Sequence, residues 1–438
     1  MTTPPRPEAR HDRAPRRPSA LRSSLTYGTR TRHGSRSRCD ARAKGLLMTA
    51  TAPARTPVER IVGARIRVLR AATRGGVAMS FAPLAHRSMV LVELHGESGA
   101  VGYGESWVNF PAWAPAERVA TLRDGVLPLV LDTPGTVQET QPRLTQRLDP
   151  LGRQWGAPGP IRQAISAVDV ALWDLAGKAA GESVAALAGG AVRTTIPTYA
   201  SSLGPTNVVA DAQDCLAAGH TAVKVKLGFG RAADQQALND ARTTLGPGAT
   251  LYADANQAWT VDEAAAMVPV LRDFGVGWLE EPIRGDRLAD LEELHSRTGI
   301  TIATGENVYG LATFEALAAS PAVAILQPDI TKAGGLTEAL AVGRLAAAAG
   351  KQVWPHLYGG ALGFAATLQL AAADATVQRV EYDVRHNPLR DPLLTAPPVP
   401  RAGVVTIPAA PGLGVALDRH AVQEYTEDAQ LVGNVSDS

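Results

Sequence analysis

The sequence predicts an α/β protein in which a (β/α) barrel follows a separate α+β domain. Short runs of β-forming residues recur from residue 195 onward at intervals of 23 to 29 residues, and Ala-rich stretches of helical character separate them. There are eight such runs, and eight parallel strands are the number that closes a barrel. The runs begin at Thr195, Ala222, Leu251, Trp278, Thr301, Ile325, Gln352 and Val380.

An open, doubly wound sheet is the alternative arrangement of such units. It should have a glycine-rich phosphate-binding turn after its first strand. The segment after Ser201 reads SLGPTN, and the chain contains neither a P-loop nor a GxGxxG motif. The sequence therefore favours the closed barrel.

The rest of the chain divides around this barrel. We expect a disordered basic tail at 1–47, an α+β domain at 58–192, the barrel at 193–383, and a C-terminal segment at 384–438 that packs back on both domains. The α+β domain is predicted from two strand-like runs, 61–70 and 88–95, that are followed by helical stretches.

The net charge of +1 is the sum of two unlike parts. Residues 1–47 contain 12 basic and three acidic side chains, a charge of +9, whereas the remainder has a charge of −8. The composition and prolines of the tail predict disorder. We favour Met48 as the natural start, and a non-functional extension or a working basic arm are the alternatives. The acidic body excludes a nucleic-acid partner.

Two further classes of protein are excluded by the sequence. No apolar run reaches the roughly 18 residues of a membrane helix, so no membrane span is expected. The two cysteines, Cys39 and Cys215, are too few for a disulfide scaffold or the usual structural zinc site. Because no secretory signal is recognisable either, we expect a cytoplasmic protein.

Ionisable residues lie at the C-terminal ends of the predicted strands. Residues two apart in a strand share a face, so Lys224 and Lys226 point the same way, as do Asp254 and Asn256. In a barrel, the rim at these strand ends forms the active site. Burying so many charges would be prohibitive without a bound cation and a charged ligand, so we predict a functional site. One residue on each of seven consecutive strands belongs to it: Lys226, Asp254, Glu280, Glu306, Asp329, His356 and Glu381.

Three of these carboxylates predict a metal site. Asp254, Glu280 and Glu306 lie on adjacent strands. Hard oxygen ligands without a neighbouring cysteine suit Mg²⁺. Glu281 competes with Glu280 for this role, and the shared parity of Glu280 with the inward Trp278 favours Glu280.

Several motifs together resemble a known family. Between residue 58 and about residue 417, the chain is similar to mandelate racemase/muconate lactonizing enzyme-like proteins of the enolase superfamily, in the mandelate racemase subgroup. The resemblance implies a modified (β/α) barrel below a capping domain whose loops close on the substrate. The motifs are K-x-K at 224–226, D-x-N at 254–256, AVDVALWDLAGKAAG at 167–181, W-L-E-E-P, G-E-N at 305–307, Q-P-D followed by K-A-G-G, and P-H-L-Y-G-G.

The resemblance also implies a first chemical step. A proton α to a carboxylate is removed to give an enediolate, and Mg²⁺ offsets the charge that develops. Lys226 would be the base on one face of the substrate, and His356, oriented by Asp329, would act on the other. Lys224 should lower the pKa of Lys226 and bind the substrate carboxylate. Asn256 would assist at the metal, and Glu381, if protonated, would donate a hydrogen bond to the carboxylate.

Dehydration of an acid sugar is the reaction we favour. Racemisation or epimerisation of a 2-hydroxy acid, as in mandelate racemase, is the alternative. A non-catalytic carboxylate-binding protein is a distant third, because such a protein would be expected to have lost Lys226 or His356. In each case the partner is a small carboxylate, and the family suggests a homo-oligomer.

Two loops of the capping domain are expected to set specificity. They are 73–87 and 106–115. The second contains Trp107, Phe110 and Trp113, which could form an apolar lid, although core packing of these aromatics is equally compatible with the sequence.

Overall fold

The computed structural model describes residues 56–74, 78–131, 133, 135–190 and 192–435. The predicted tail at 1–47 and the proposed start at Met48 lie outside these residues. No helix in the described part of the chain is long and apolar enough to cross a membrane.

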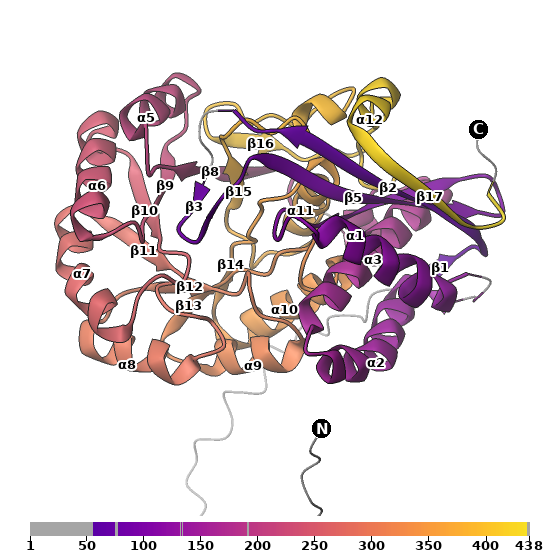
Figure 1. Cartoon of the computed structure of the whole chain (residues 1–438), viewed down its shortest axis with the longest axis horizontal. Helices are drawn as coiled ribbons and strands as arrows, with labels where there is room; N and C mark the ends of the chain where they lie inside the picture. The colour runs from indigo at the N-terminus through magenta and orange to yellow at the C-terminus, as the bar shows by residue number, and fades with distance from the viewer. Residues whose placement is uncertain (1–55, 75–77, 132, 134, 191, 436–438) are drawn as a thin grey trace, which may run out of the picture. The chain divides into compact units, whose positions relative to one another are not determined.

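All eight predicted barrel strands are present, which confirms the predicted fold class (Figure 1). They pair in parallel in the order β14-β13-β12-β11-β10-β9-β8-β15. Among the described residues, Val353 of β14 forms an isolated parallel bridge with Val377, three residues before β15, and no ladder joins the two end strands. The strands are β8 (Thr195–Leu203), β9 (Ala222–Lys226), β10 (Thr250–Asp254), β11 (Val276–Glu280), β12 (Ile302–Thr304), β13 (Val323–Leu326), β14 (Gln352–Val353) and β15 (Val380–Asp383).

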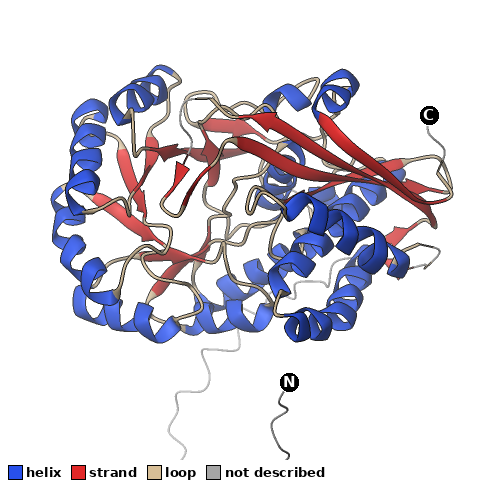
Figure 2. Ribbon diagram, in the orientation of Figure 1, coloured by secondary structure: helices blue, strands red, loops and turns tan. Residues whose placement is uncertain are grey.

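Helices alternate with these strands and lie outside them (Figure 2). Local sequence sets their ends. The side chain of Thr260 caps α7 by accepting a hydrogen bond from the Glu263 N–H, while Glu263 reaches back to the Thr260 N–H. α8 ends at Gly299, whose φ of 65° suits glycine. The helices are α5 (Val208–Ala217), α6 (Arg231–Leu245), α7 (Val261–Asp273), α8 (Leu288–Thr298), α9 (Leu311–Ala319), α10 (Leu336–Ala349) and α11 (Ala361–Ala373).

An aromatic layer fills the barrel below its charged residues. Inward-facing side chains two positions before Asp254 and Glu280 are Tyr252 and Trp278, whose rings stack with centroids 4.4 Å apart. Tyr199 and Trp354 pack against both at 5.5 to 5.9 Å. This layer separates the charged residues from the N-terminal end of the barrel.

The residues before the barrel, together with one C-terminal strand, form the capping domain. Its antiparallel sheet has the order β17-β2-β5-β6. The buried helix α3 packs on β6, and a Cβ at Gly104 would lie 1.9 Å from the Ala167 carbonyl oxygen, so only glycine permits this approach. The elements are β2 (Ile61–Ala72), β5 (His86–Gly96), β6 (Val101–Trp107), α1 (Ala114–Ala120), α2 (Val137–Trp155), α3 (Pro158–Ala180) and β17 (Thr426–Gly433).

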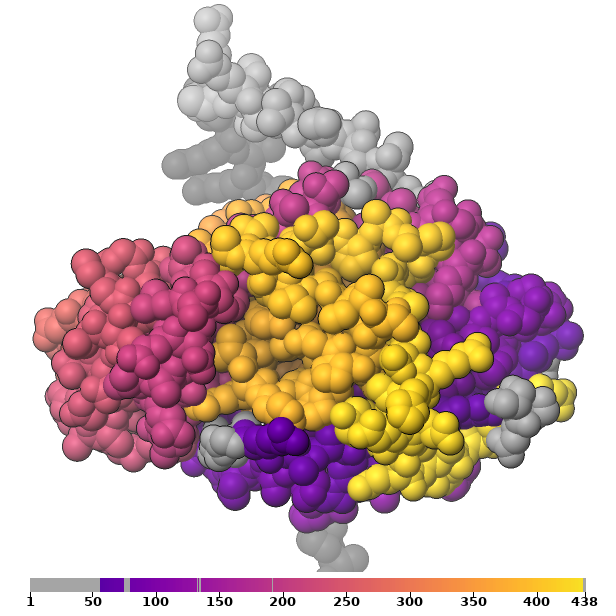
Figure 3. All heavy atoms as spheres, turned by 90° about the horizontal axis from the view of Figure 1, so that it is seen from above, coloured from indigo at the N-terminus to yellow at the C-terminus, as the bar shows by residue number. Residues whose placement is uncertain are grey.

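The C-terminal residues join the two domains. β16 (Val404–Thr406) pairs with β8 of the barrel, whereas β17 pairs with β2 of the capping domain. Figure 3 shows these residues, orange to yellow, between the first barrel units and the capping domain. The remaining short elements are β1 (Pro57–Val58), β3 (Ala78–Met79), β4 (Ala82–Pro83), β7 (Gly135–Thr136), α4 (Val184–Leu187) and α12 (Arg419–Tyr425), with turns of π-helix at Thr121–Val126 and of 3₁₀ helix at Leu127–Leu129 and Asp391–Leu393.

Candidate active site

A cavity of about 430 Å³ lies between the C-terminal ends of the barrel strands and the capping domain. Four of the predicted site residues line it: Lys226, Asn256, Glu306 and His356. The others, Lys224, Asp254, Glu280, Asp329 and Glu381, are buried beside it and are at most 2% exposed. The strand ends therefore bring the predicted residues together in two layers, one that lines the cavity and one behind it.

Lys224 belongs to the buried layer. Its Nζ lies 2.7 Å from Glu280 Oε1 and 2.9 Å from Glu381 Oε1, and the side chain is inaccessible to solvent. Burial lowers the pKa of Lys224, but the two carboxylates outweigh it and hold the pKa well above its usual value. Lys224 thus neutralises the carboxylates below the cavity and does not line the cavity itself.

Lys226 lies at the boundary between the layers. Its Nζ is 2.5 Å from Asp254 Oδ2 and 3.0 Å from Asn256 Oδ1. Burial and the Lys224 ammonium lower the pKa of Lys226, but the nearby carboxylates, Asp254 foremost, outweigh them, so this pKa lies above its usual value. This is opposite to the direction expected from Lys224 alone, because the carboxylate is the closer charge.

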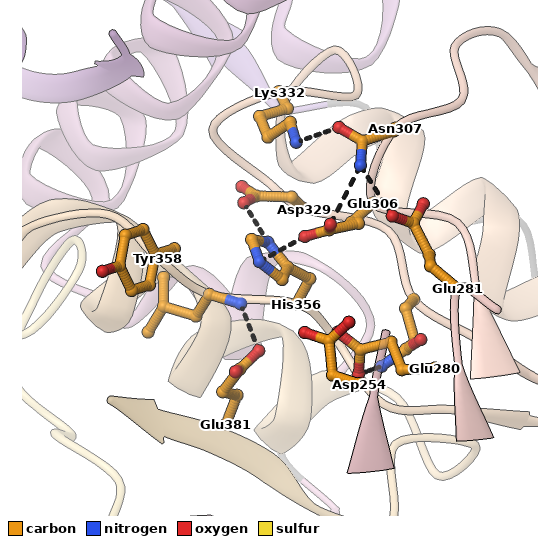
Figure 4. A network of polar contacts seen from close by, with 12 residues as sticks. Asp254, Glu280, Glu281, Glu306, Asn307, Asp329, Lys332, His356, Tyr358 and Glu381 are labelled. Atoms are coloured by element: carbon orange, nitrogen blue, oxygen red, sulfur yellow. Dashed lines mark hydrogen bonds and ion pairs between the residues drawn. The ribbon is translucent and has the colours of Figure 1, made fainter. Parts of the chain in front are cut away.

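His356 is held from both sides of its ring. Nδ1 lies 2.7 Å from Asp329 Oδ2, and Nε2 forms an ion pair with Glu306 (Figure 4). Burial lowers the pKa of His356, but Glu306 and Asp329 raise it well above its usual value. The backbone N–H and the hydroxyl of Thr331 both donate to Asp329 Oδ1 at 2.7 Å, which fixes the carboxylate that orients the imidazole.

The three predicted metal ligands come from adjacent strands. Asp254 and Glu280 are direct neighbours in the β10–β11 ladder, and Glu306 follows β12. All three are buried, and their oxygen donors suit Mg²⁺ in type. The described residues contain no group of three His, Cys, Asp or Glu side chains arranged to hold a metal ion. Each of the three carboxylates is paired with a cation of the protein: Glu280 with Lys224, Asp254 with Lys226 and Glu306 with His356.

Glu280 and Glu281 point to different places. Glu280 accepts a hydrogen bond from Gln327 Nε2 at 2.6 Å and lies inside the barrel, and its burial raises its pKa to about 8. Glu281 lines the cavity, with a left-handed φ of 36°. Its Oε2 accepts from Asn307, while its buried Oε1 has no partner among the described residues. The predicted parity of Glu280 with Trp278 agrees with this arrangement.

Lys332 is a cavity residue that strand parity does not predict. It lies on the loop after β13, is 4% exposed, and donates to Asn307 Oδ1 at 2.7 Å. Its Nζ lies 5.0 Å from the centre of the Trp107 ring. In Figure 4, Lys332 and Glu381 lie on opposite sides of His356. Only the K-A-G-G motif pointed to this position, and it gave no direction for the side chain.

The apolar wall of the cavity comes from the capping domain. Met79, Phe81, Trp107 and Phe110 line it, so two of the three predicted lid aromatics reach the cavity. Trp113 does not, and its side chain is 73% exposed. The wall faces the charged strand ends and narrows the access of water to them.

Known proteins with the same two-domain arrangement identify the family. The N-terminal domain of mandelate racemase / muconate lactonizing enzyme matches residues 62–189, and the enolase C-terminal domain-like family matches residues 207–421. D-galactarolactone cycloisomerase from Agrobacterium fabrum is 33% identical over 77% of this chain and 91% of its own length. The chain belongs to the mandelate racemase/muconate lactonizing enzyme family of the enolase superfamily. It is therefore an enzyme, as the sequence predicted.

Other members of this family show how the shared fold is used. Arabinonate dehydratase from Saccharolobus solfataricus is 29% identical over 80% of this chain and 94% of its own length. A mandelate racemase/muconate lactonizing enzyme from Bordetella bronchiseptica has a solved structure with a TM-score of 0.76 and 35% identity, over 83% of this chain and 99% of that one. A racemase from Streptomyces coelicolor, with a TM-score of 0.74 and 26% identity over 84% and 99% of the two chains, contains bound magnesium.

Proposed function

We propose that this enzyme dehydrates an acid sugar by removing the proton α to its carboxylate. The observation that supports this most directly is that one cavity is lined by Lys226, at the end of β9, and by His356, after β14, and these two strands are not neighbours in the barrel. Relatives named arabinonate dehydratase, L-rhamnonate dehydratase and D-galactonate dehydratase support an acid sugar as the substrate class.

Asp254, Glu280 and Glu306 are the residues that would hold Mg²⁺. The bound ion would supply positive charge next to the substrate carboxylate, where negative charge develops. Asn256 and Lys226 already share the Asp254 carboxylate, so their positions depend on the same group.

Lys226 and His356 each carry out one of the two proton transfers. Lys226 accepts the α-proton, and for this its amine must first be neutral, so the ion pair with Asp254 has to weaken. His356 donates its Nε2 proton to the β-hydroxyl, which leaves as water when the Cα–Cβ double bond forms. The resulting enol rearranges to a 2-keto-3-deoxy acid. Asp329 retains the imidazole orientation throughout.

Lys332 is the residue we assign to a substrate oxygen away from the reacting carbon. An ammonium group has three donors, and one of them is bound to Asn307. Because the side chain is nearly buried and lines the cavity, an acceptor on the substrate would satisfy the remaining donors. Hydroxyl or carboxylate oxygens of an acid sugar have this chemistry.

Racemisation or epimerisation is the second candidate. It needs the same two groups on opposite faces and no leaving group. The apolar wall at Trp107 and Phe110 would suit a less polar hydroxy acid, which favours this alternative.

A substrate panel separates the two reactions. We would incubate the purified protein with Mg²⁺ and a panel of aldonates and aldarates, and assay 2-keto-3-deoxy acids. The same panel, extended with 2-hydroxy acids, would be followed in D₂O by NMR. Dehydration predicts keto acid that disappears when a chelator removes Mg²⁺, whereas racemisation predicts α-deuterium without keto acid. If no carboxylate in either set loses its α-proton, the proposed function is wrong.

A further inference from the structure

The two loops that contain Asp329 and His356 have the same ending. Each finishes in a pair of glycines at the start of a barrel helix: Gly334 and Gly335 before α10, and Gly359 and Gly360 before α11. The predicted chemistry does not use these glycines. In each loop, however, they border a buried carboxylate from the capping domain.

Glu105 of β6 is the carboxylate at the His356 loop. Its Oε1 accepts a hydrogen bond from the Gly360 N–H at 2.5 Å, and its Oε2 accepts from the Gly363 N–H at 2.8 Å. A Cβ at Gly359 would lie 2.8 Å from the same Oε1, so the glycine leaves room for the carboxylate. Glu105 is 1% exposed, and its burial raises its pKa to about 7, although the backbone N–H groups at the N-terminus of α11 favour the charged form.

Asp169 of α3 occupies the equivalent place at the Asp329 loop. Its two oxygens accept hydrogen bonds from the backbone N–H and the hydroxyl of Thr337, at 2.9 and 2.6 Å, in the first turn of α10. A Cβ at Gly335 would lie 2.3 Å from Asp169 Oδ2. The side chain is inaccessible to solvent, so this contact is also sealed inside the protein.

Two residues beyond Glu105 extend the contact. Trp107, the last residue of β6, shares a strand face with Glu105, and Asn109 lies two residues after the strand. The Trp107 N–H donates to the carbonyl of Thr331, the residue that holds Asp329. Asn109 Nδ2 donates to the carbonyl of Tyr358, two residues after His356, at 2.9 Å.

We infer that the capping domain positions the Asp329–His356 pair through Glu105, Asp169 and Asn109. These three residues would then act on catalysis only indirectly, by holding one of the two acid–base groups in place. The side chain of Lys226 is positioned differently, because its hydrogen bonds within the described structure go to the barrel residues Asp254 and Asn256. The inference rests on the proposed function only in assigning catalysis to His356. Loss of a capping contact should therefore affect the His356 side of the site selectively.

Glu105→Gln is the principal test, with Glu93→Gln as its control. Glu93 is also a buried carboxylate on the same face of the capping sheet, but it pairs with Arg67 and lines a separate cavity that contains no residue of either loop. Two readouts need no substrate: amide hydrogen exchange of the peptide that covers residues 356–363, and the rate at which diethyl pyrocarbonate modifies His356. We expect Glu105→Gln to accelerate both about tenfold or more and Glu93→Gln to leave both unchanged.

A third readout separates positioning from general destabilisation. In D₂O with Mg²⁺, D-galactonate and its C2 epimer D-talonate present their α-protons to opposite faces. One of the two exchange reactions should be abolished in His356→Asn, and Glu105→Gln should slow that reaction about 10- to 100-fold. The other should be abolished in Lys226→Met, and Glu105→Gln should slow it by less than about twofold. Equal losses on both faces would overturn the inference, as would loop protection and His356 reactivity identical to those of Glu93→Gln.

The substrate-free readouts keep this test independent of the proposed function. If the wild-type protein exchanges neither sugar acid, the choice of substrate is wrong, but the loop measurements still decide whether Glu105 holds the His356 loop. Asn109→Ala, which removes a single hydrogen bond to the same loop, replaces Glu105→Gln if that variant does not fold.

Discussion

The two proposed acid–base groups are positioned by different parts of the molecule. Lys226 is the last residue of β9, and its partners are Asp254, the last residue of β10, and Asn256 in the turn that follows. His356 lies on a loop after β14, where Asp329, Glu306 and contacts from the capping domain fix it. The hydrogen bonds of the lysine therefore come from the barrel, whereas the loop of the histidine is held by both domains.

The two groups therefore reach their final positions at different stages of folding. A group built into a ladder is in place once the strands pair, whereas a group on a loop is in place once the domains have packed. A substrate in the cavity would also contact Trp107, whose N–H donates to the Thr331 carbonyl beside Asp329. Binding and positioning of the histidine are thus physically connected.

The largest expected effect comes from removing either group. Lys226→Met and His356→Asn should each lower turnover about 10²- to 10⁴-fold, the usual contribution of general acid–base catalysis. In D₂O, each variant should retain α-proton exchange only on the face of the other residue. Lys178→Met, which removes a capping-domain lysine outside the cavity, is the control. Loss of exchange on both faces in either variant would show that the two groups do not act independently.

A smaller effect is expected at Lys332. Lys332→Met should lower kcat/KM about 10- to 100-fold, because a hydrogen bond to a charged group contributes roughly 1.5–3 kcal/mol. The loss should appear mainly in KM, and Lys332→Arg should recover part of it. Steady-state kinetics on the best sugar acid of the panel measure this. An unchanged KM in Lys332→Met would remove Lys332 from substrate binding.

The contact at Asp169 predicts a pH-dependent stability. Burial raises the pKa of Asp169 from 3.8 to about 7, so the folded state binds a proton where the unfolded chain has released it. The contribution of this group to stability therefore falls as the pH rises from about 4 to about 7. Asp169→Asn removes that dependence. Between pH 5 and pH 8, its free energy of unfolding should improve relative to wild type by on the order of 2 kcal/mol.

Urea unfolding of both proteins at the two pH values measures this difference. A difference between Asp169→Asn and wild type that stays the same at pH 5 and pH 8 would show that Asp169 ionises normally in the folded protein.

The smallest effects are expected in the lid. Phe110→Ala should raise KM several-fold, because Phe110 lines the cavity and shields it from water. Trp113→Ala removes a larger ring three residues away, yet that ring is 73% exposed, so activity should not change and stability should change by less than about 0.5 kcal/mol. Kinetics and thermal melts of the two variants compare them directly. Similar KM values would mean that the lid does not contact the substrate.

Prediction from sequence succeeded where structure is local. The period of two along a strand placed Lys226, Asp254 and Glu280 correctly on the inner face, and the spacing of the runs located all eight strands. The direction of the Lys226 pKa was wrong, because parity shows that Lys224 is near but does not show that Asp254 is nearer.

Residues outside the strands could not be placed in this way. Lys332 enters the cavity from a loop, and Glu105 contacts the His356 loop because the two domains pack together, and no periodicity encodes either position. The glycine pairs were visible as motifs, but a glycine indicates only that something approaches closely. Which side chain approaches is decided by the packing of the two domains.

The aromatic layer beneath Lys224 fills the lower part of the barrel. Tyr199, Tyr252, Trp278 and Trp354 pack together there, whereas Lys226 lines the cavity on the other side of the charged residues. A substrate in this cavity would cover Lys226 and slow the exchange of its protons with solvent. The return of a hydrogen from Lys226 to the carbon that lost it would then compete with the uptake of deuterium from solvent.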